Sequence, residues 1–147
     1  MKRRVFVFIM AVALTILAAT AMAGCSAEAF EETYNDDAKI VKSSSSAEVG
    51  AARILTSTAF TYNANKFSGV KQVRKLDLTA NPTFKDVKLT ITGGKFKVVL
   101  IKDGKVHVLA DKNNDGDIKM ENLEAGKYTL KIVGVEAKVS LSMNLTF

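Results

Sequence analysis

The sequence has one cysteine, one proline, one histidine and no tryptophan. A lone cysteine excludes an internal disulfide and a cysteine-based metal site. With one histidine, a Ser-His-Asp arrangement would depend on His107 alone. The sequence also lacks a Gly-x-Ser-x-Gly elbow, a phosphate loop and a His-Glu-x-x-His helix. We therefore expect a protein that is not an enzyme and that has no cofactor.

The N-terminus contains the most specific motif. Three basic residues at positions 2–4 precede an uncharged run from Val5 to Ala23, and the only cysteine follows at Cys25. The sequence Met22-Ala23-Gly24-Cys25 resembles the lipobox of bacterial lipoproteins, Leu-Ala/Ser-Gly/Ala-Cys, with Met in place of Leu. This resemblance implies that residues 1–24 are a signal peptide and that the Cys25 thiol carries a lipid (palmitate). It also implies a membrane-anchored protein on the extracytoplasmic side, either at the cell surface or facing the periplasm.

Two other fates of the N-terminus remain open. The uncharged run could stay as a membrane-spanning helix, because about 20 apolar residues suffice to cross a bilayer. Cleavage after Ala21-Met22-Ala23 could instead release a soluble protein. The position of the only cysteine favours the lipoprotein.

Charge divides the remaining chain into two parts. Residues 26–50 hold six acidic residues against two lysines and include four consecutive serines, whereas residues 51–147 hold sixteen basic residues against nine acidic ones. The first part, together with Cys25, predicts a flexible stalk over residues 25–50, because it has too little apolar surface to order itself. In the second part the lysines alternate with apolar residues, so we expect a solvated surface and no nucleic-acid partner. A net positive domain could be drawn to anionic envelope surfaces.

From Ala51 onward the apolar residues recur with period two, which is typical of half-buried strands. The clearest strand is the last, where one face carries Val139, Leu141, Met143, Leu145 and Phe147. Turns are predicted at Gly93-Gly94, Asp103-Gly104, Asp115-Gly116, residues 124–126 and Gly134, and Asp103-Gly104 is typical of a type I′ hairpin. The fold predicted for residues 51–147 is all-β, an antiparallel, jelly-roll-like β-sandwich of about eight strands. The eight strands are expected at 54–62, 70–78, 87–91, 96–100, 105–110, 118–123, 128–132 and 135–147.

The segment from Phe96 to Ile132 carries a second resemblance. It places the Asp103-Gly104 hairpin before the Asp/Asn-rich run 111–116 and the strand Leu123-Glu-Ala-Gly-Lys-Tyr-Thr-Leu-Lys-Ile132. This order resembles small extracellular β-sandwiches of the pre-peptidase C-terminal and GOLD-like kind. The resemblance implies a non-catalytic accessory or adhesion module, with jelly-roll carbohydrate-binding domains similar in shape.

One loop has the spacing of a calcium site. Oxygen-bearing side chains alternate around Gly116 as at positions 1, 3, 5 and 7 of an EF-hand loop, and position 12 is Asn122 where a bidentate acid is expected. The alternative is a polar turn in which Asn, Asp and Gly serve backbone geometry. The candidate calcium ligands are Asp111, Asn113, Asp115, Asp117 and Glu121.

These observations define a class of function. We expect a membrane-anchored extracytoplasmic lipoprotein whose sandwich binds a cell-envelope protein or glycan, or supports an envelope assembly. One alternative is a calcium-stabilised adhesion or carbohydrate-binding module. A small hydrolase built around His107 is the other.

Overall fold

The computed structural model describes residues 27–147. The signal peptide, the lipobox and Cys25 lie outside the described residues. Residues 27–34 are helical, and the elements that follow are α2 (Asp37–Lys42), β1 (Ser46–Val49), β2 (Ala52–Leu55), β3 (Ala59–Leu78), β4 (Thr83–Lys102), β5 (Lys105–Ala110), β6 (Asn114–Lys119) and β7 (Gly126–Asn144). No helix within residues 27–147 is both long enough and apolar enough to span a membrane.

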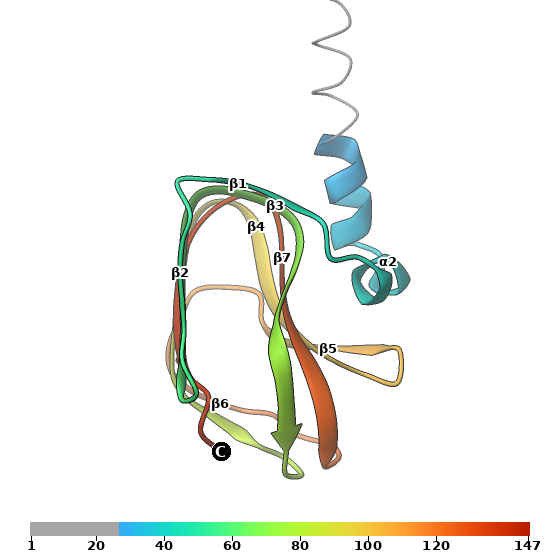
Figure 1. Cartoon of the computed structure of the whole chain (residues 1–147), viewed down its shortest axis with the longest axis vertical. Helices are drawn as coiled ribbons and strands as arrows, with labels where there is room; N and C mark the ends of the chain where they lie inside the picture. The colour runs from blue at the N-terminus through green and yellow to red at the C-terminus, as the bar shows by residue number, and fades with distance from the viewer. Residues whose placement is uncertain (1–26) are drawn as a thin grey trace, which may run out of the picture.

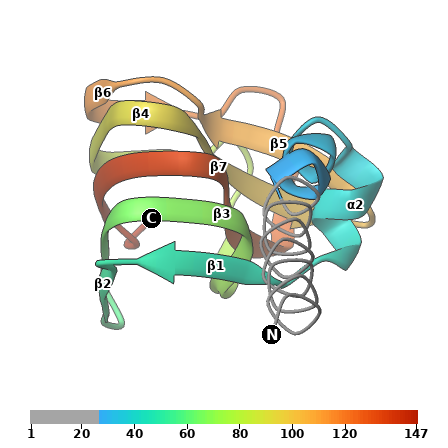
Figure 2. The same cartoon turned by 90° about the horizontal axis from the view of Figure 1, so that it is seen from above.

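The seven strands form one antiparallel sheet that folds over on itself. Three long strands run side by side in the order β3-β7-β4 and bend near their middles, so that the sheet arches as seen in Figure 1 and from above in Figure 2. Each edge of the sheet consists of two short strands, β1 and β2 along β3, and β5 and β6 along β4. The two arms of the arch therefore lie face to face as the two layers of a sandwich.

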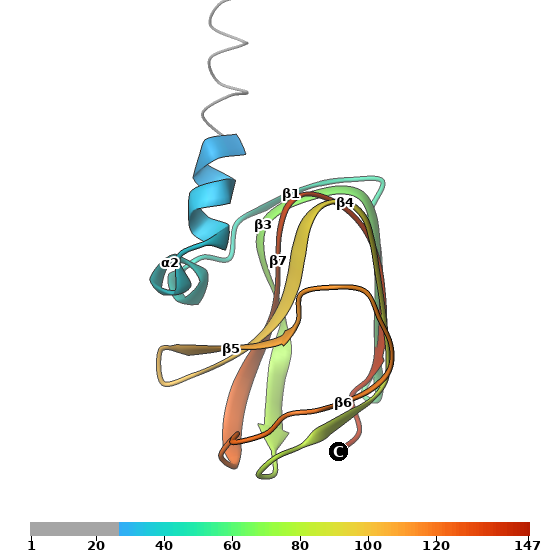
Figure 3. The same cartoon turned by 180° about the vertical axis from the view of Figure 1, so that it is seen from behind.

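Each layer has its own segments and its own edges. The open layer comprises residues 59–64, 83–92 and 137–144 with β2 and β6. The covered layer comprises residues 67–78, 95–102 and 126–135 with β1 and β5. Figure 3 shows both layers from behind, with the N-terminal helices outside the covered layer.

Glycines at the arch let the long strands bend without ending. Gly94 has a φ of 66°, and a Cβ there would lie 2.3 Å from the carbonyl oxygen of Val135. A Cβ on Gly134 would lie 2.6 Å from the ring of Phe67. The predicted turns at Gly93-Gly94 and Gly134 are therefore wrong, because these glycines serve close approach and curvature within continuous strands instead of chain reversal.

The space between the layers is filled by one apolar core. Aromatic rings occupy the inside of the arch, where Tyr62 stacks on Phe96 and Phe67 meets both rings edge to face. Each long strand contributes side chains from alternate positions, as expected for strands with one face in a core. The fully buried members include Phe60, Tyr62, Phe67, Phe84, Val87, Leu89, Phe96, Val98, Leu100, Tyr128, Leu130, Ile132 and Leu141.

The all-β, sandwich-like architecture expected from the sequence is confirmed, and so is the type I′ hairpin. Asp103 and Gly104 have φ values of 51° and 74°, and the flanking lysines 102 and 105 pair across the turn. Residues 27–147 form seven strands where about eight were expected: three pairs of expected segments join into the three long strands, which leaves five, and β1 and β2 bring the number to seven. The segment Ile54–Tyr62 is not one strand, since the chain reverses between β2 and β3, where the Thr56 hydroxyl accepts a hydrogen bond from the Ala59 N–H at 2.9 Å. The Asp115-Gly116 turn is also wrong, because both residues lie inside β6.

The predicted flexible stalk is corrected for residues 27–50. Residues 27–34 and α2 are helical, β1 pairs with β3, and Ile40 is fully buried. Composition did not predict this ordered structure, because only a few apolar side chains of the segment pack against the sheet. Its other contacts are made by lysines of the sheet.

Candidate functional site

The N-terminal cover, defined as residues 27–42, lies on the outer face of the covered layer (Figure 3). Ile40 packs there in a second apolar cluster, separate from the sandwich core. The sheet contributes Val70, Val99, Ile101 and Val133 to this cluster, and Tyr34, Val41 and Val106 pack at its border. This part of the sheet is therefore apolar on both faces.

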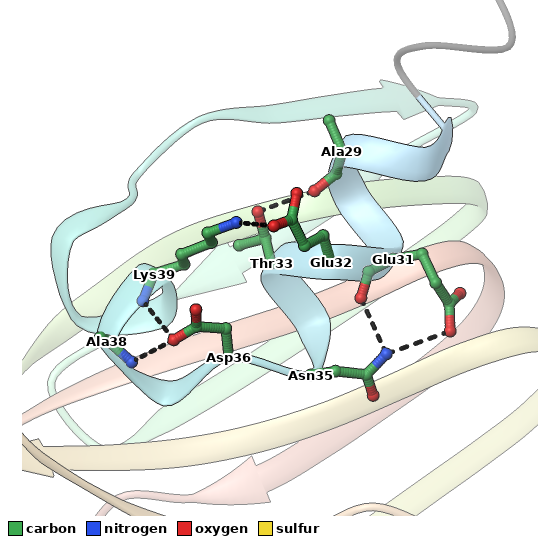
Figure 4. A network of polar contacts seen from close by, with 8 residues as sticks. All are labelled: Ala29, Glu31, Glu32, Thr33, Asn35, Asp36, Ala38 and Lys39. Carbon is green, nitrogen blue, oxygen red and sulfur yellow. Dashed lines mark hydrogen bonds and ion pairs between the residues drawn. The ribbon is translucent and has the colours of Figure 1, made fainter.

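Local hydrogen bonds stabilise the two helical segments of the cover (Figure 4). The Asp36 carboxylate caps α2 by accepting from the backbone N–H groups of Ala38 and Lys39 at 2.9 and 3.2 Å, which is the role of an N-cap acid. The Asn35 amide donates to the carbonyl oxygen of Glu31 at 2.9 Å and so closes the preceding helix. The turn between the helices is thus specified by its own sequence.

Three lysines of the sheet bind the cover. The Lys131 ammonium, on β7, donates to the carbonyl oxygens of Ile40, Val41 and Ser43 at 3.0, 3.0 and 2.7 Å. Lys97, on β4, donates to the carbonyl oxygen of Tyr34 at 2.8 Å and lies 4.5 Å from the centre of its ring. Both lysines therefore meet carbonyls at the C-terminal ends of the cover's helices, where a positive charge also complements the helix dipole.

The third lysine and the burial of the other two set the electrostatics of this interface. Lys95 forms an ion pair with Glu31, and its ammonium holds the pKa of that carboxyl below the usual value. Burial lowers the pKa of Lys97, partly offset by the carboxylates of Asp37 and Asp111. Burial also lowers the pKa of Lys131, which is one of the two buried polar or charged residues found within residues 27–147.

A polar hollow lies beside the β4–β5 hairpin. It has a volume of about 200 Å³ and is lined by Lys102, Asp103, Lys105, His107, Asn122, Glu124 and Tyr128. The Tyr128 hydroxyl donates to the carbonyl oxygen of Glu124 at 2.8 Å, and the His107 ring meets the Tyr128 ring edge to face at 6.0 Å. The wall of the hollow includes His107 and two carboxylates but no serine or threonine. A Ser-His-Asp arrangement is therefore not assembled around His107 in this hollow.

The predicted calcium loop, residues 111–122, contains a strand. Residues 114–119 form β6, which pairs with β4 and extends the side chains along an edge instead of wrapping them around one point. The Asp117 carboxylate accepts from Lys85 at 2.9 Å and from the backbone N–H of Asp86 at 3.0 Å. The Asn113 oxygen accepts from the N–H of Ile91 at 2.7 Å.

The remaining candidate ligands do not complete a site. Asp115 faces Lys88 at 3.9 Å, Asp111 lies in the link before β6, and Glu121 lies beyond its end. Within residues 27–147, no three acidic, histidine or cysteine side chains cluster closely enough to hold a metal ion. The Asn113 and Asp117 oxygens therefore bond to residues of β4 in this structure, and the calcium site stays a prediction.

A buried polar group lies near the β1 edge. The Tyr62 hydroxyl makes no hydrogen bond with the described residues, and burial, with the nearby Glu48 carboxylate, raises its pKa above the usual value. Burial alone would raise the pKa of Glu48, but its ion pair with Lys71 holds that pKa below the usual value. The two charges at this edge, on Glu48 and Lys71, are therefore paired with each other.

Comparison with known proteins gives no family. No protein-family model matches the chain, and no curated protein matches it either.

The lysines that bind the cover were not identified from the sequence, where they look like ordinary residues of a solvated face. The available signal was apolar residues on that same face, because Val99 follows Lys97 and Val133 follows Lys131 at strand spacing.

Proposed function

We propose that the protein is an exported lipoprotein, anchored through a lipid on Cys25, whose β-sandwich is a non-catalytic binding or structural module on the outer side of a membrane. The observation that carries this proposal is the sequence Met22-Ala23-Gly24-Cys25 after an uncharged run, with no other cysteine in the chain. Its partner would be an envelope protein or glycan.

The N-terminal cover supports a particular form of this anchoring. Residue 27, the first that the structure describes, is helical and comes two residues after Cys25, and the cover is bound to the sheet by Lys95, Lys97 and Lys131. Consecutive Cα atoms are about 3.8 Å apart, so the path from the lipid to ordered structure is short. The module would therefore be held close to the membrane, with little freedom to reorient.

Metabolic labelling tests the anchor. A chain produced in a bacterium with an alkyne-tagged palmitate should incorporate label, and Cys25→Ala should abolish it and leave the precursor uncleaved or released. Gly24→Ala is the matched control, because the lipobox accepts either residue at that position, and it should keep the label. Label that persists in Cys25→Ala would show that the lipoprotein proposal is wrong.

A further inference from the structure

The two edges of the sheet differ in the side chains that they expose. The apolar edge, formed by β1 and β2, presents Val49, Ile54 and Leu55 with exposed fractions of 61%, 64% and 37%. Among residues 27–147, these are three of the five large apolar side chains that are exposed. The opposite edge, formed by β5 and β6, carries Lys105, Asp115, Asp117 and Lys119 and exposes one such side chain, Val108.

Charged side chains are the usual protection of an edge strand against pairing with another chain. The β5–β6 edge has this protection, whereas β2 has a single charged residue, Arg53. The Arg53 guanidinium donates to the carbonyl oxygen of Val73 at 3.2 Å and lies 6.0 Å from the centre of the Phe60 ring. Its charge is therefore directed back over the protein and does not guard the edge.

The backbone of β2 is also available for pairing. Strand β2 pairs with β3 on one side, and the structure of residues 27–147 places no strand on its other side. In an antiparallel ladder, alternate residues direct their N–H and C=O groups away from the partner strand. The apolar edge thus combines unpaired backbone groups with exposed apolar side chains.

We propose that β2 pairs antiparallel with β2 of a second copy of this chain, about a two-fold axis at Ile54. This register places Ile54 opposite Ile54 of the second copy on the outer face, and Arg53 opposite Leu55 of the second copy on the inner face. A register centred on Arg53 would instead place two arginines opposite each other, which is unfavourable. The pairing does not depend on lipid attachment to Cys25.

A second copy fits this edge better than a charged partner strand. Residues 52, 54 and 55 of β2 are uncharged, and Arg53 already has partners within its own chain, so two copies meet without an unmatched charge. An isologous contact needs a surface that complements itself, and a short apolar strand paired with its own copy satisfies this condition.

Cysteine cross-linking tests the register directly in the full chain. Cα atoms that face each other in an antiparallel ladder are about 4.5 to 5.5 Å apart, within the range of a disulfide. Ile54→Cys should therefore form a disulfide-linked dimer under mild oxidation, with residue 54 joined to residue 54 in peptide mapping. Ala52→Cys is the matched control, because its copies would lie about 13 Å apart at four residue rises. A dimer linked through position 52, or none through position 54, overturns the proposed pairing.

Molar mass in solution provides the second measurement. The full chain in mild detergent should be a dimer by light scattering, and Ile54→Lys should raise its dissociation constant about tenfold or more. Val108→Lys, on the opposite edge, should leave the dimer unchanged, and both variants should keep the far-UV circular dichroism spectrum of the unaltered chain. A chain that remains monomeric at about 100 μM, where even weak homodimers associate, contradicts the proposal. A dimer that Val108→Lys dissociates and Ile54→Lys does not would also overturn it.

Discussion

The two halves of strand β7 have similar alternating sequences but differ in what lies on their outer face. In the covered layer, Lys131 and Val133 are 5% and 1% exposed, because the N-terminal cover lies over them. In the open layer, Lys138, Ser140 and Ser142 face solvent. The difference shows that one strand can be buried on both faces at one end and on one face at the other. Which of the two occurs depends on whether another segment, here the N-terminal cover, packs on the outer face.

The largest effect expected from this comparison is in the open layer, where burial is one-sided. Leu141 is fully buried, and Leu141→Ala should lower the free energy of unfolding by about 2 to 5 kcal/mol through lost burial and a cavity. Ser140→Ala and Ser142→Ala, on the opposite face, should change it by no more than about 0.5 kcal/mol. Urea denaturation measures all three. An effect of Ser142→Ala as large as that of Leu141→Ala would mean that the open layer is also covered.

In the covered layer, substitutions in the N-terminal cover should also lower the free energy of unfolding. Ile40 is fully buried in the second apolar cluster, so Ile40→Ala should cost about 2 to 4 kcal/mol of unfolding free energy in the same assay. Lys42→Ala, on the same helix, is the control and should cost no more than about 0.5 kcal/mol. If Ile40→Ala has no effect, the cover does not contribute to the stability of the domain.

Most of the sheet was predictable from the sequence because its inner face obeys a local rule. In the open layer, residues that alternate in the sequence around Leu89 and Leu141 also alternate between core and surface, and the hairpin at Asp103-Gly104 follows from two residues that tolerate positive φ. The continuity of the long strands was not predictable, because a glycine at a bend and a glycine at a turn look the same locally. Gly94 is a bend only because β7 passes close to it.

Less of the candidate site was predictable, because its residues meet over long sequence separations. Lys131 and Ile40 come together only after the sheet has formed, and neither neighbourhood carries a motif that points to the other. The strand conformation of residues 114–119 was missed for a related reason. Alternating Asp and Asn residues suit a loop around a cation, but they also suit an edge strand whose side chains bond to the neighbouring strand, as Asp117 does.

Lys131 and Lys138 lie on the same strand, β7, one in the covered layer and one in the open layer. The same substitution at both positions therefore compares the two layers. Lys131→Met keeps most of the side-chain volume but leaves the backbone carbonyls of Ile40, Val41 and Ser43 without their donor. Because hydrogen bonds to a charged group are stronger than neutral ones, we expect a loss of about 1.5 to 3 kcal/mol in unfolding free energy. Lys138→Met should stay within about 0.5 kcal/mol. Hydrogen exchange at residues 37–42 should also accelerate in Lys131→Met alone, and equal exchange in both variants would argue against the role of Lys131.

The smallest expected effect is the pH dependence of the difference in unfolding free energy between the unaltered chain and Lys131→Met. Burial lowers the pKa of Lys131 in the folded protein, whereas an unfolded lysine titrates near its ordinary value of about 10.4. Between the two pKa values the unfolded state binds more protons, so this group makes stability rise with pH there. The gap in unfolding free energy between the unaltered chain and Lys131→Met should therefore widen from pH 8 to about pH 10.5.

Matched variants isolate this effect of pH from other groups that titrate in the same range. Burial raises the pKa of Tyr62, so Tyr62 makes stability fall as the pH rises above about 10, the ordinary tyrosine value. That fall is common to the unaltered chain, Lys131→Met and Lys138→Met, and it cancels when their unfolding free energies are subtracted. If the gap to Lys131→Met narrows instead, the three carbonyls favour the charged ammonium by more than burial opposes it, and the polar contact with α2 outweighs desolvation at this end of β7.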